Sequence, residues 1–123
     1  MKLMKAIAKI DSLKQNTYDR SEKIAWLSEL DGMVKRQIID THEGGSQVPF
    51  SGYDLSTPDE QELLVSAPFA EMYLLWLEGK IDYYNGDYTR FNNAMTLFDA
   101  AYKAFGDDYT RTHIPLGTGG RFR

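Results

Sequence analysis

Cysteine is absent from the chain, and its absence excludes disulfide bonds and thiolate metal sites. No run of apolar residues approaches the length of about 18 that indicates a membrane-spanning helix. Lys5 and Lys9 interrupt the apolar start of the sequence, so we expect no signal-peptide core there. These absences predict a soluble protein that is intracellular when made and has no membrane partner.

Charge is unevenly distributed along the chain, whose net charge is −4. Residues 1–39 carry 8 basic and 5 acidic side chains, and residues 40–108 carry 3 basic and 13 acidic ones. Residues 109–123 carry 3 basic side chains and no acidic one. Basic ends and an acidic middle would let copies of the chain attract one another head to tail. The alternative is that charges simply fall unevenly on a small surface.

Apolar residues recur at helical spacing in four segments, which predicts an all-α fold with four main helices. We expect the first over roughly 3–14 and the second over 20–42, with Asp19 and Glu22 forming a capping box. The third begins near Pro68 and is apolar on every side between Met72 and Leu77. Residues 85–87 (Asn-Gly-Asp) then join it to the fourth as an antiparallel helical hairpin, because the period on both sides is 3.6 rather than 2.

The fourth helix carries a seam of large side chains spaced alternately by three and four residues. This spacing would suit a coiled-coil partner, an aromatic ligand site or the inside of a small helical protein. A long coiled coil favours Leu, Ile or Val, whereas aromatic rings fill wide, irregular gaps. We therefore interpret the seam as intramolecular core. It consists of Tyr88, Phe91, Met95, Phe98, Tyr102, Phe105 and Tyr109.

Two segments lie outside the predicted helices. Residues 44–67 are expected to form a long loop, or a small β-ribbon between residues 47–50 and 62–65, with an acidic tip that we interpret as a contact arm. The stretch 110–123 holds one proline, three glycines and three arginines, which predicts a flexible basic C-terminal tail. The tail either becomes ordered against a partner or is a frayed terminus. The expected organisation is a helical domain over 1–109 with the arm inserted, followed by the tail.

No pattern of catalytic or ligand-binding residues stands out. His42 lies between Asp40 and Glu43, but the helical zinc pattern needs a second histidine four residues on, and the only other one is His113. A capping or surface role is expected for His42. The pI near 5.1 lies far below the value of about 9 that is typical of nucleic-acid-binding domains. We predict that the protein is not an enzyme and uses no metal and no cofactor.

Three stretches, residues 22–45 (EKIAWLSELDGMVKRQIIDTHEGG), 63–105 (LLVSAPFAEMYLLWLEGKIDYYNGDYTRFNNAMTLFDAAYKAF) and 111–115 (RTHIP), resemble a known family. It comprises head–tail connector proteins (adaptor, or head-completion, proteins) of tailed phages and prophages of Gram-positive bacteria. The resemblance covers most of the chain and consists of packing and turn patterns. One departure is Gly106, which we expect to shorten or kink the fourth helix.

The resemblance implies a small helical structural protein that is located at the head–tail junction of the virion and in the host cytoplasm during assembly. It implies a homo-oligomeric ring of twelve copies beneath the portal protein, from a subunit that is monomeric in isolation. The partners would be the portal protein and neighbouring connector subunits, and DNA would pass through without specific binding. The residues assigned to partner binding are Arg111, His113, Ile114, Leu116, Arg121, Phe122 and Arg123 in the tail and Asp54, Asp59, Glu60 and Glu62 in the arm.

Two other functions remain open from the sequence. One is a small helical peptide- or protein-binding module with a groove lined by Tyr83, Tyr84 and Tyr88, which would fail if these tyrosines were buried. The other is a small enzyme, which would need an apolar pocket holding a perturbed carboxylate or His42.

Overall fold

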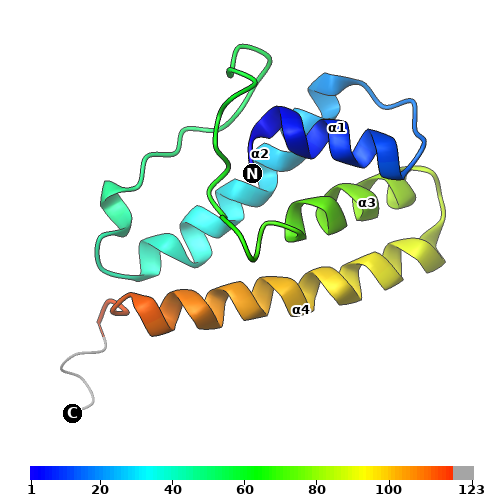
Figure 1. Cartoon of the computed structure of the whole chain (residues 1–123). Helices are drawn as coiled ribbons and strands as arrows, with labels where there is room; N and C mark the ends of the chain where they lie inside the picture. The colour runs from blue at the N-terminus through cyan, green and yellow to red at the C-terminus, as the bar shows by residue number, and fades with distance from the viewer. Residues whose placement is uncertain (118–123) are drawn as a thin grey trace.

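In the part of the chain that the structure describes, four α-helices are arranged around one hydrophobic core (Figure 1). The computed structural model describes residues 1–117 of the 123-residue chain. No β-strand occurs in this range, so the predicted all-α class with four main helices is confirmed. The elements are α1 (Leu3–Leu13), α2 (Arg20–Gln37), the 3₁₀ turns η1 (Ile39–Thr41) and η2 (Gly45–Gln47), α3 (Met72–Tyr84) and α4 (Tyr88–Thr112).

Helices α3 and α4 form the predicted antiparallel hairpin and make the most extensive contact between elements. Gly86, with a φ of 78°, ends α3 in the left-handed conformation that favours glycine. Asp87 caps the N-terminus of α4, because its side chain accepts a hydrogen bond of 3.1 Å from the Arg90 amide. The helical turn predicted at residues 85–87 is therefore confirmed.

Helix α3 lies in the centre of the molecule, with α1 and α2 on one side and α4 on the other. Met72, Tyr73, Leu77 and Ile81 are fully buried, as its apolar composition predicts. Gly79 and the buried Ala94 give the two hairpin helices room to approach, and the Met95 side chain lies against the glycine. Burial of each large apolar side chain stabilises the fold by about 1.5–3 kcal/mol.

The aromatic seam of α4 is core along only part of its length. Phe98 and Phe105 are buried, whereas Tyr88 is 59% exposed. Phe91, Met95, Tyr102 and Tyr109 are half-buried. The interpretation of the whole seam as core is therefore wrong at its N-terminal end, because α3 ends at Tyr84 and covers only part of this surface.

Three expectations about helix ends are corrected. The Asp19 side chain makes no capping hydrogen bond, and only its backbone carbonyl accepts bonds from the Glu22 and Lys23 amides. The second helix ends at Gln37, and η1 continues it to Thr41. The third begins at Met72, because the residues just after Pro68 form isolated turns.

Helix α4 continues unbroken through Gly106 to Thr112, which corrects the expected shortening or kink. A glycine in a helix interior costs about 1 kcal/mol relative to alanine. Burial of Phe105 beside it, on the same helix, offsets that cost. The boundary between body and tail therefore lies three residues beyond the predicted Tyr109.

The loop between α2 and α3 forms no β-ribbon. Residues 62–65 pair with the N-terminus rather than with residues 47–50, because the Leu63 amide donates to the Met1 carbonyl and the Leu3 amide to the Gln61 carbonyl. These bonds make an isolated antiparallel bridge between Lys2 and Glu62. The loop is thus held against α1 at one end.

Candidate functional site

The acidic arm folds back onto the basic N-terminal region of the same chain. Asp59 pairs with Arg20, Glu60 with Lys2 at 2.6 Å, and the Glu62 carboxylate with the N-terminal amine at 3.4 Å. Asp54 differs, since it accepts hydrogen bonds within its own turn, from the Ser56 amide and hydroxyl. The uneven charge distribution is thus at least partly neutralised within one molecule.

These arm carboxylates remain open to solvent despite their partners. The side chains of Asp59, Glu60 and Glu62 are 61%, 75% and 65% exposed. Exposed ion pairs contribute little to stability, so a binding partner could replace them at little cost. A role of the arm in partner binding stays a prediction.

The C-terminal segment, residues 113–117, lies against the turn that follows α2. The Glu43 amide donates to the Ile114 carbonyl at 2.7 Å, and the Leu116 amide donates to the Thr41 carbonyl at 2.9 Å. These bonds belong to an antiparallel bridge between His42 and Pro115. The part of the predicted tail that the structure describes is therefore held by backbone pairing.

Side chains along this segment point outward. Ile114 and Leu116 are 61% and 54% exposed, although both are apolar. The His113 ring stacks on Tyr109 with centroids 3.8 Å apart, and Arg111 is exposed beside Asp108. The other predicted tail residues, Arg121, Phe122 and Arg123, lie outside the described range.

His42 is buried, which excludes the surface alternative, whereas its contact with the carbonyl of Ile38, the C-cap of α2, confirms the capping alternative. Its Nδ1 lies 2.6 Å from the Ile38 carbonyl oxygen, and its Nε2 lies 3.0 Å from the Thr110 hydroxyl. A carbonyl oxygen only accepts hydrogen bonds, so Nδ1 donates its proton there, and in that tautomer Nε2 accepts from the Thr110 hydroxyl. The imidazole thereby links the end of α2 to the end of α4, beneath the bridge with Pro115.

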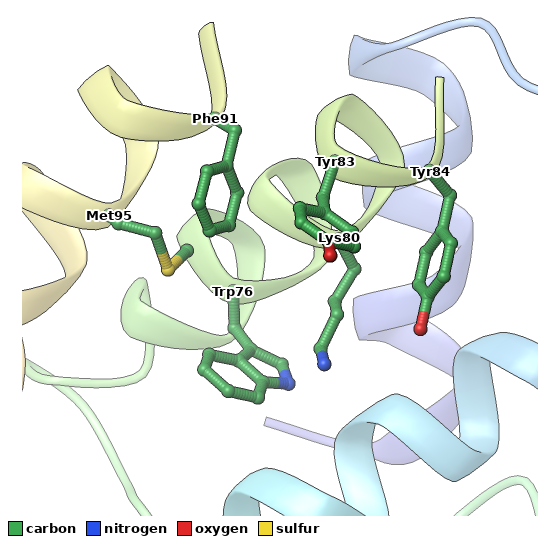
Figure 2. A pocket seen from close by; sticks show the side chains of 6 residues that line it. All are labelled: Trp76, Lys80, Tyr83, Tyr84, Phe91 and Met95. Atoms are coloured by element: carbon green, nitrogen blue, oxygen red, sulfur yellow. The ribbon is translucent and has the colours of Figure 1, made fainter. Parts of the chain in front are cut away.

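A hollow of about 440 Å³ opens at the other end of the α3–α4 hairpin (Figure 2). It is mainly aromatic, and Tyr83 and Tyr84 are 46% and 56% exposed. Tyr83 contacts Phe91 with ring centroids 5.2 Å apart. The hollow is lined by Trp76, Lys80, Tyr83 and Tyr84 of α3 and by Phe91 and Met95 of α4.

The orientation of the lining is set by hydrogen bonds and stacking from α2. Trp76 donates its indole N–H to the Trp26 carbonyl at 2.8 Å, and Tyr84 stacks on the Trp26 ring with an interplanar angle of 7°. The Lys80 ammonium lies 4.9 Å from the centre of the Trp76 ring and 2.8 Å from a Glu29 carboxylate oxygen. The hollow thus presents fixed aromatic faces and one neutralised cation.

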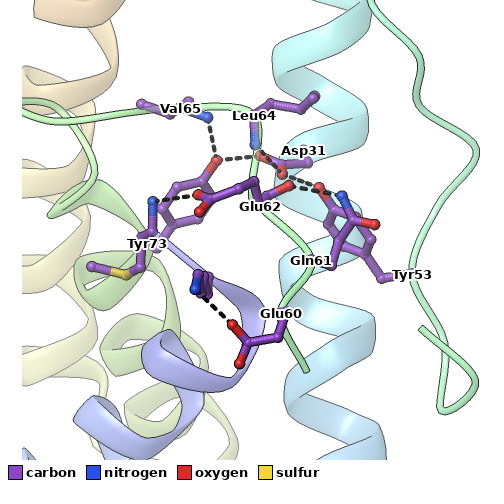
Figure 3. A network of polar contacts seen from close by, with 10 residues as sticks. Asp31, Tyr53, Glu60, Gln61, Glu62, Leu64, Val65 and Tyr73 are labelled. Carbon is purple, nitrogen blue, oxygen red and sulfur yellow. Dashed lines mark hydrogen bonds and ion pairs between the residues drawn. The ribbon is translucent and has the colours of Figure 1, made fainter. Parts of the chain in front are cut away.

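A second polar centre lies inside the molecule, at Asp31 of α2 (Figure 3). Its carboxylate accepts hydrogen bonds of 2.6 Å from Tyr53, 2.6 Å from Tyr73 and 3.0 Å from the Leu64 amide. Burial raises the pKa of Asp31 above its ordinary value, and these hydrogen bonds act in the opposite direction. Burial and the Asp31 charge likewise raise the pKa of both tyrosines. With all its donors supplied by the chain, this centre anchors the long loop to α2.

Within residues 1–117 no group of three or more His, Asp or Glu side chains is placed to hold a metal ion. None of the helices in that range has the length and apolar character required to cross a bilayer.

Comparison with known proteins gave no match: no family model fits the chain, and no curated protein or solved structure is similar to it at a significant level. The resemblance to phage connector proteins therefore stays an expectation.

Sequence reasoning missed the hollow and the Asp31 centre. It named Tyr83, Tyr84 and Tyr88 as a possible groove, and the structure brings the first two together with four other residues, of which Phe91 and Met95 were interpreted as core. The signal for Asp31 was a lone acid on the apolar stripe of α2, four residues after Leu27 and three before Val34.

Proposed function

We propose that the protein is a structural adaptor in the head–tail connector of a tailed phage, which assembles as a ring on the portal protein and lets DNA pass. The proposal follows the resemblance of residues 22–45, 63–105 and 111–115 to that family. Its fold is in keeping with this role, since it is a small helical body with exposed apolar or aromatic side chains near both ends of α4.

The observation that carries the proposal is the geometry of the C-terminal segment. Backbone bonds to Thr41 and Glu43 hold the segment in an extended form, and the apolar side chains of Ile114 and Leu116 face solvent. Two neighbouring apolar side chains presented on a fixed backbone offer a surface that a protein partner can cover. In the proposed function this partner is the portal protein.

The direct test is electron microscopy of the purified full-length chain mixed with the portal protein encoded in the same phage genome. We expect rings of the chain bound to portal particles and co-sedimentation of the two proteins. Absence of any association at micromolar concentrations of both proteins would contradict the adaptor function.

A double variant, Ile114→Ser with Leu116→Ser, tests the surface itself. We expect it to retain the helical circular-dichroism spectrum and to lose portal association, because it removes only exposed apolar area. Leu97→Ser is the matched control, since Leu97 is also an exposed leucine (59%) but lies in the middle of α4. Equal portal binding by the double variant and the control would exclude this segment as the contact.

The second candidate is a helical module that binds peptides or proteins through the aromatic hollow. The specific observation in its favour is the exposure of Tyr83, Tyr84 and Tyr88, whose burial would have ruled it out. A hollow of about 440 Å³ lies within the range of about 300–1,000 Å³ that is usual for ligand pockets. This candidate differs from the first in that it needs no portal protein.

A further inference from the structure

The aromatic hollow is suited to an aromatic side chain flanked by cations. Its walls are the rings of Trp76, Tyr83, Tyr84 and Phe91, and such rings attract both another ring and a guanidinium group. The hollow already holds a cation over one ring, the Lys80 ammonium above Trp76. Glu29, which pairs with Lys80 at 2.8 Å, has a side chain that is 52% exposed, so its carboxylate can accept a second positive charge beside the hollow.

The sequence contains one segment outside the described residues with this chemistry. Residues 121–123 read Arg-Phe-Arg, and residues 117–120 read Gly-Thr-Gly-Gly. A phenylalanine between two arginines matches an aromatic hollow that has one exposed carboxylate, Glu29, beside it.

The same molecule cannot supply this segment to its own hollow. Met95 and Thr112 lie about 25 Å apart along α4, at about 1.5 Å per residue. The chain from Gly117 to Phe122 spans at most about 18 Å when fully extended, at about 3.6 Å per residue. In addition, the backbone bonds to Thr41 and Glu43 hold residues 114 and 116 at the end of α4 that is remote from the hollow (Figure 1).

We infer that the hollow binds residues 121–123 of a second copy of the chain. Phe122 enters between Tyr83, Tyr84 and Phe91, and the two arginines lie against the exposed tyrosines and Glu29. The contact joins different surfaces of the two copies, so it is heterologous and repeats from subunit to subunit until a ring closes. This inference rests on the proposed function and names the contact between neighbouring subunits of the proposed ring.

A peptide of residues 117–123 tests the contact in its simplest form. It is titrated into a dilute solution of the full-length chain, and binding is followed by tryptophan fluorescence, because Trp76 lines the hollow and Trp26 stacks on Tyr84. We expect saturable binding, and a dissociation constant at least tenfold higher for the same peptide with Phe122→Ala. Absence of binding, or equal binding of both peptides, would overturn the inference.

Two further variants separate a specific contact from simple charge attraction. Tyr83→Ala removes a half-exposed wall of the hollow and is expected to weaken peptide binding at least tenfold, whereas Leu97→Ala, which changes an exposed residue outside the lining, leaves it unchanged. Circular dichroism verifies that both variants are folded. If binding depends on the two arginines but not on Phe122 or Tyr83, the contact is electrostatic only and the inference is wrong.

Failure of this inference is distinguishable from failure of the proposed function. A full-length chain with Phe122→Ala that still forms rings on portal would leave the adaptor function intact and would exclude the tail-to-hollow contact. A chain that binds the peptide in its hollow but never associates with portal would support the contact and contradict the adaptor function.

Discussion

The Tyr73 hydroxyl on α3 donates a hydrogen bond of 2.6 Å to the Asp31 carboxylate on α2, and neither side chain is accessible to solvent. The same hydroxyl accepts a bond of 2.7 Å from the Val65 amide, so the pair joins two helices and the returning loop. The stretch before α3 has no regular structure of its own, and it relies on this buried pair to reach the core (Figure 3).

Replacement Asp31→Ala is expected to lower the free energy of unfolding by about 3 kcal/mol. The change removes the acceptor for two tyrosine hydroxyls and the Leu64 amide, and each buried donor left unpaired costs about 1–3 kcal/mol. Urea unfolding followed by circular dichroism measures the loss. Asp54→Ala is the control, because Asp54 is exposed and bonded only within its own turn. Equal stability of the two variants would show that Asp31 does not anchor the loop.

The Asp31 carboxyl also predicts a pH dependence of stability. Its pKa is raised in the folded protein, chiefly by burial, so the folded state holds this proton more tightly than the unfolded state does. The stabilising contribution is therefore complete below the ordinary aspartate pKa of about 3.9 and is lost as pH rises through the raised native pKa. The difference in unfolding free energy between wild type and Asp31→Asn should fall across that window.

Asp54→Asn provides a control of opposite sign for the pH experiment. Hydrogen bonds from Ser56 lower the pKa of Asp54, so its contribution is present above the ordinary pKa and is lost as pH falls. Urea midpoints at a series of pH values for the three proteins give both slopes. A wild-type-minus-Asp31→Asn difference that stays constant, or that grows as pH rises, would contradict the assignment to Asp31.

The helices were predictable because their signals are local. Apolar spacing identifies all four, and the chemistry of Gly86 and Asp87 identifies the turn between α3 and α4. The effect of Gly106 on α4 was mispredicted for a related reason. The sequence shows the cost of a glycine within a helix, about 1 kcal/mol relative to alanine. The burial of Phe105, which offsets that cost, depends on the tertiary fold.

The surfaces were less predictable, because they depend on where one element stops covering another. The hollow exists because α3 ends at Tyr84 and leaves Tyr88 and Phe91 partly uncovered, and periodicity alone does not give that end point. Likewise, the pairing of Glu62 with Lys2 joins residues 60 positions apart, and no local pattern selected it over the expected ribbon.

The His42–Thr110 hydrogen bond is expected to control how firmly the C-terminal segment is held. Thr110→Val removes the hydroxyl that donates to the His42 Nε2 and leaves a buried acceptor unpaired, at a cost of about 1 kcal/mol. We expect faster hydrogen exchange at the Glu43 and Leu116 amides, which bond across the His42–Pro115 bridge.

Thr112→Val is the matched control for this experiment, since the Thr112 hydroxyl bonds only to backbone carbonyls of its own helix and to the adjacent His113 ring. Exchange is measured amide by amide by nuclear magnetic resonance. Unchanged protection of Glu43 and Leu116 in the Thr110 variant would mean that the segment is held independently of His42.

Two adjacent glycines after η1 should respond differently to alanine. A Cβ on Gly45 would overlap the Ile39 carbonyl, a backbone group that cannot move aside without disrupting the turn. A Cβ on Gly44 would meet nothing, and the only cost there is the left-handed conformation at φ 83°, about 1 kcal/mol. We expect Gly45→Ala to lower the free energy of unfolding by at least about 2 kcal/mol more than Gly44→Ala does.

Urea unfolding of the two alanine variants measures this difference, and hydrogen exchange locates its effect. Because Lys35 donates a hydrogen bond of 3.1 Å to the Gly45 carbonyl, displacement of Gly45 should also loosen the end of α2 and the bridge that holds residues 113–117. The Leu116 amide should therefore exchange faster in Gly45→Ala than in Gly44→Ala. Equal stabilities, with equal protection of that amide, would show that the turn tolerates a side chain at Gly45 and that its close approach to Ile39 does not determine the path of the chain.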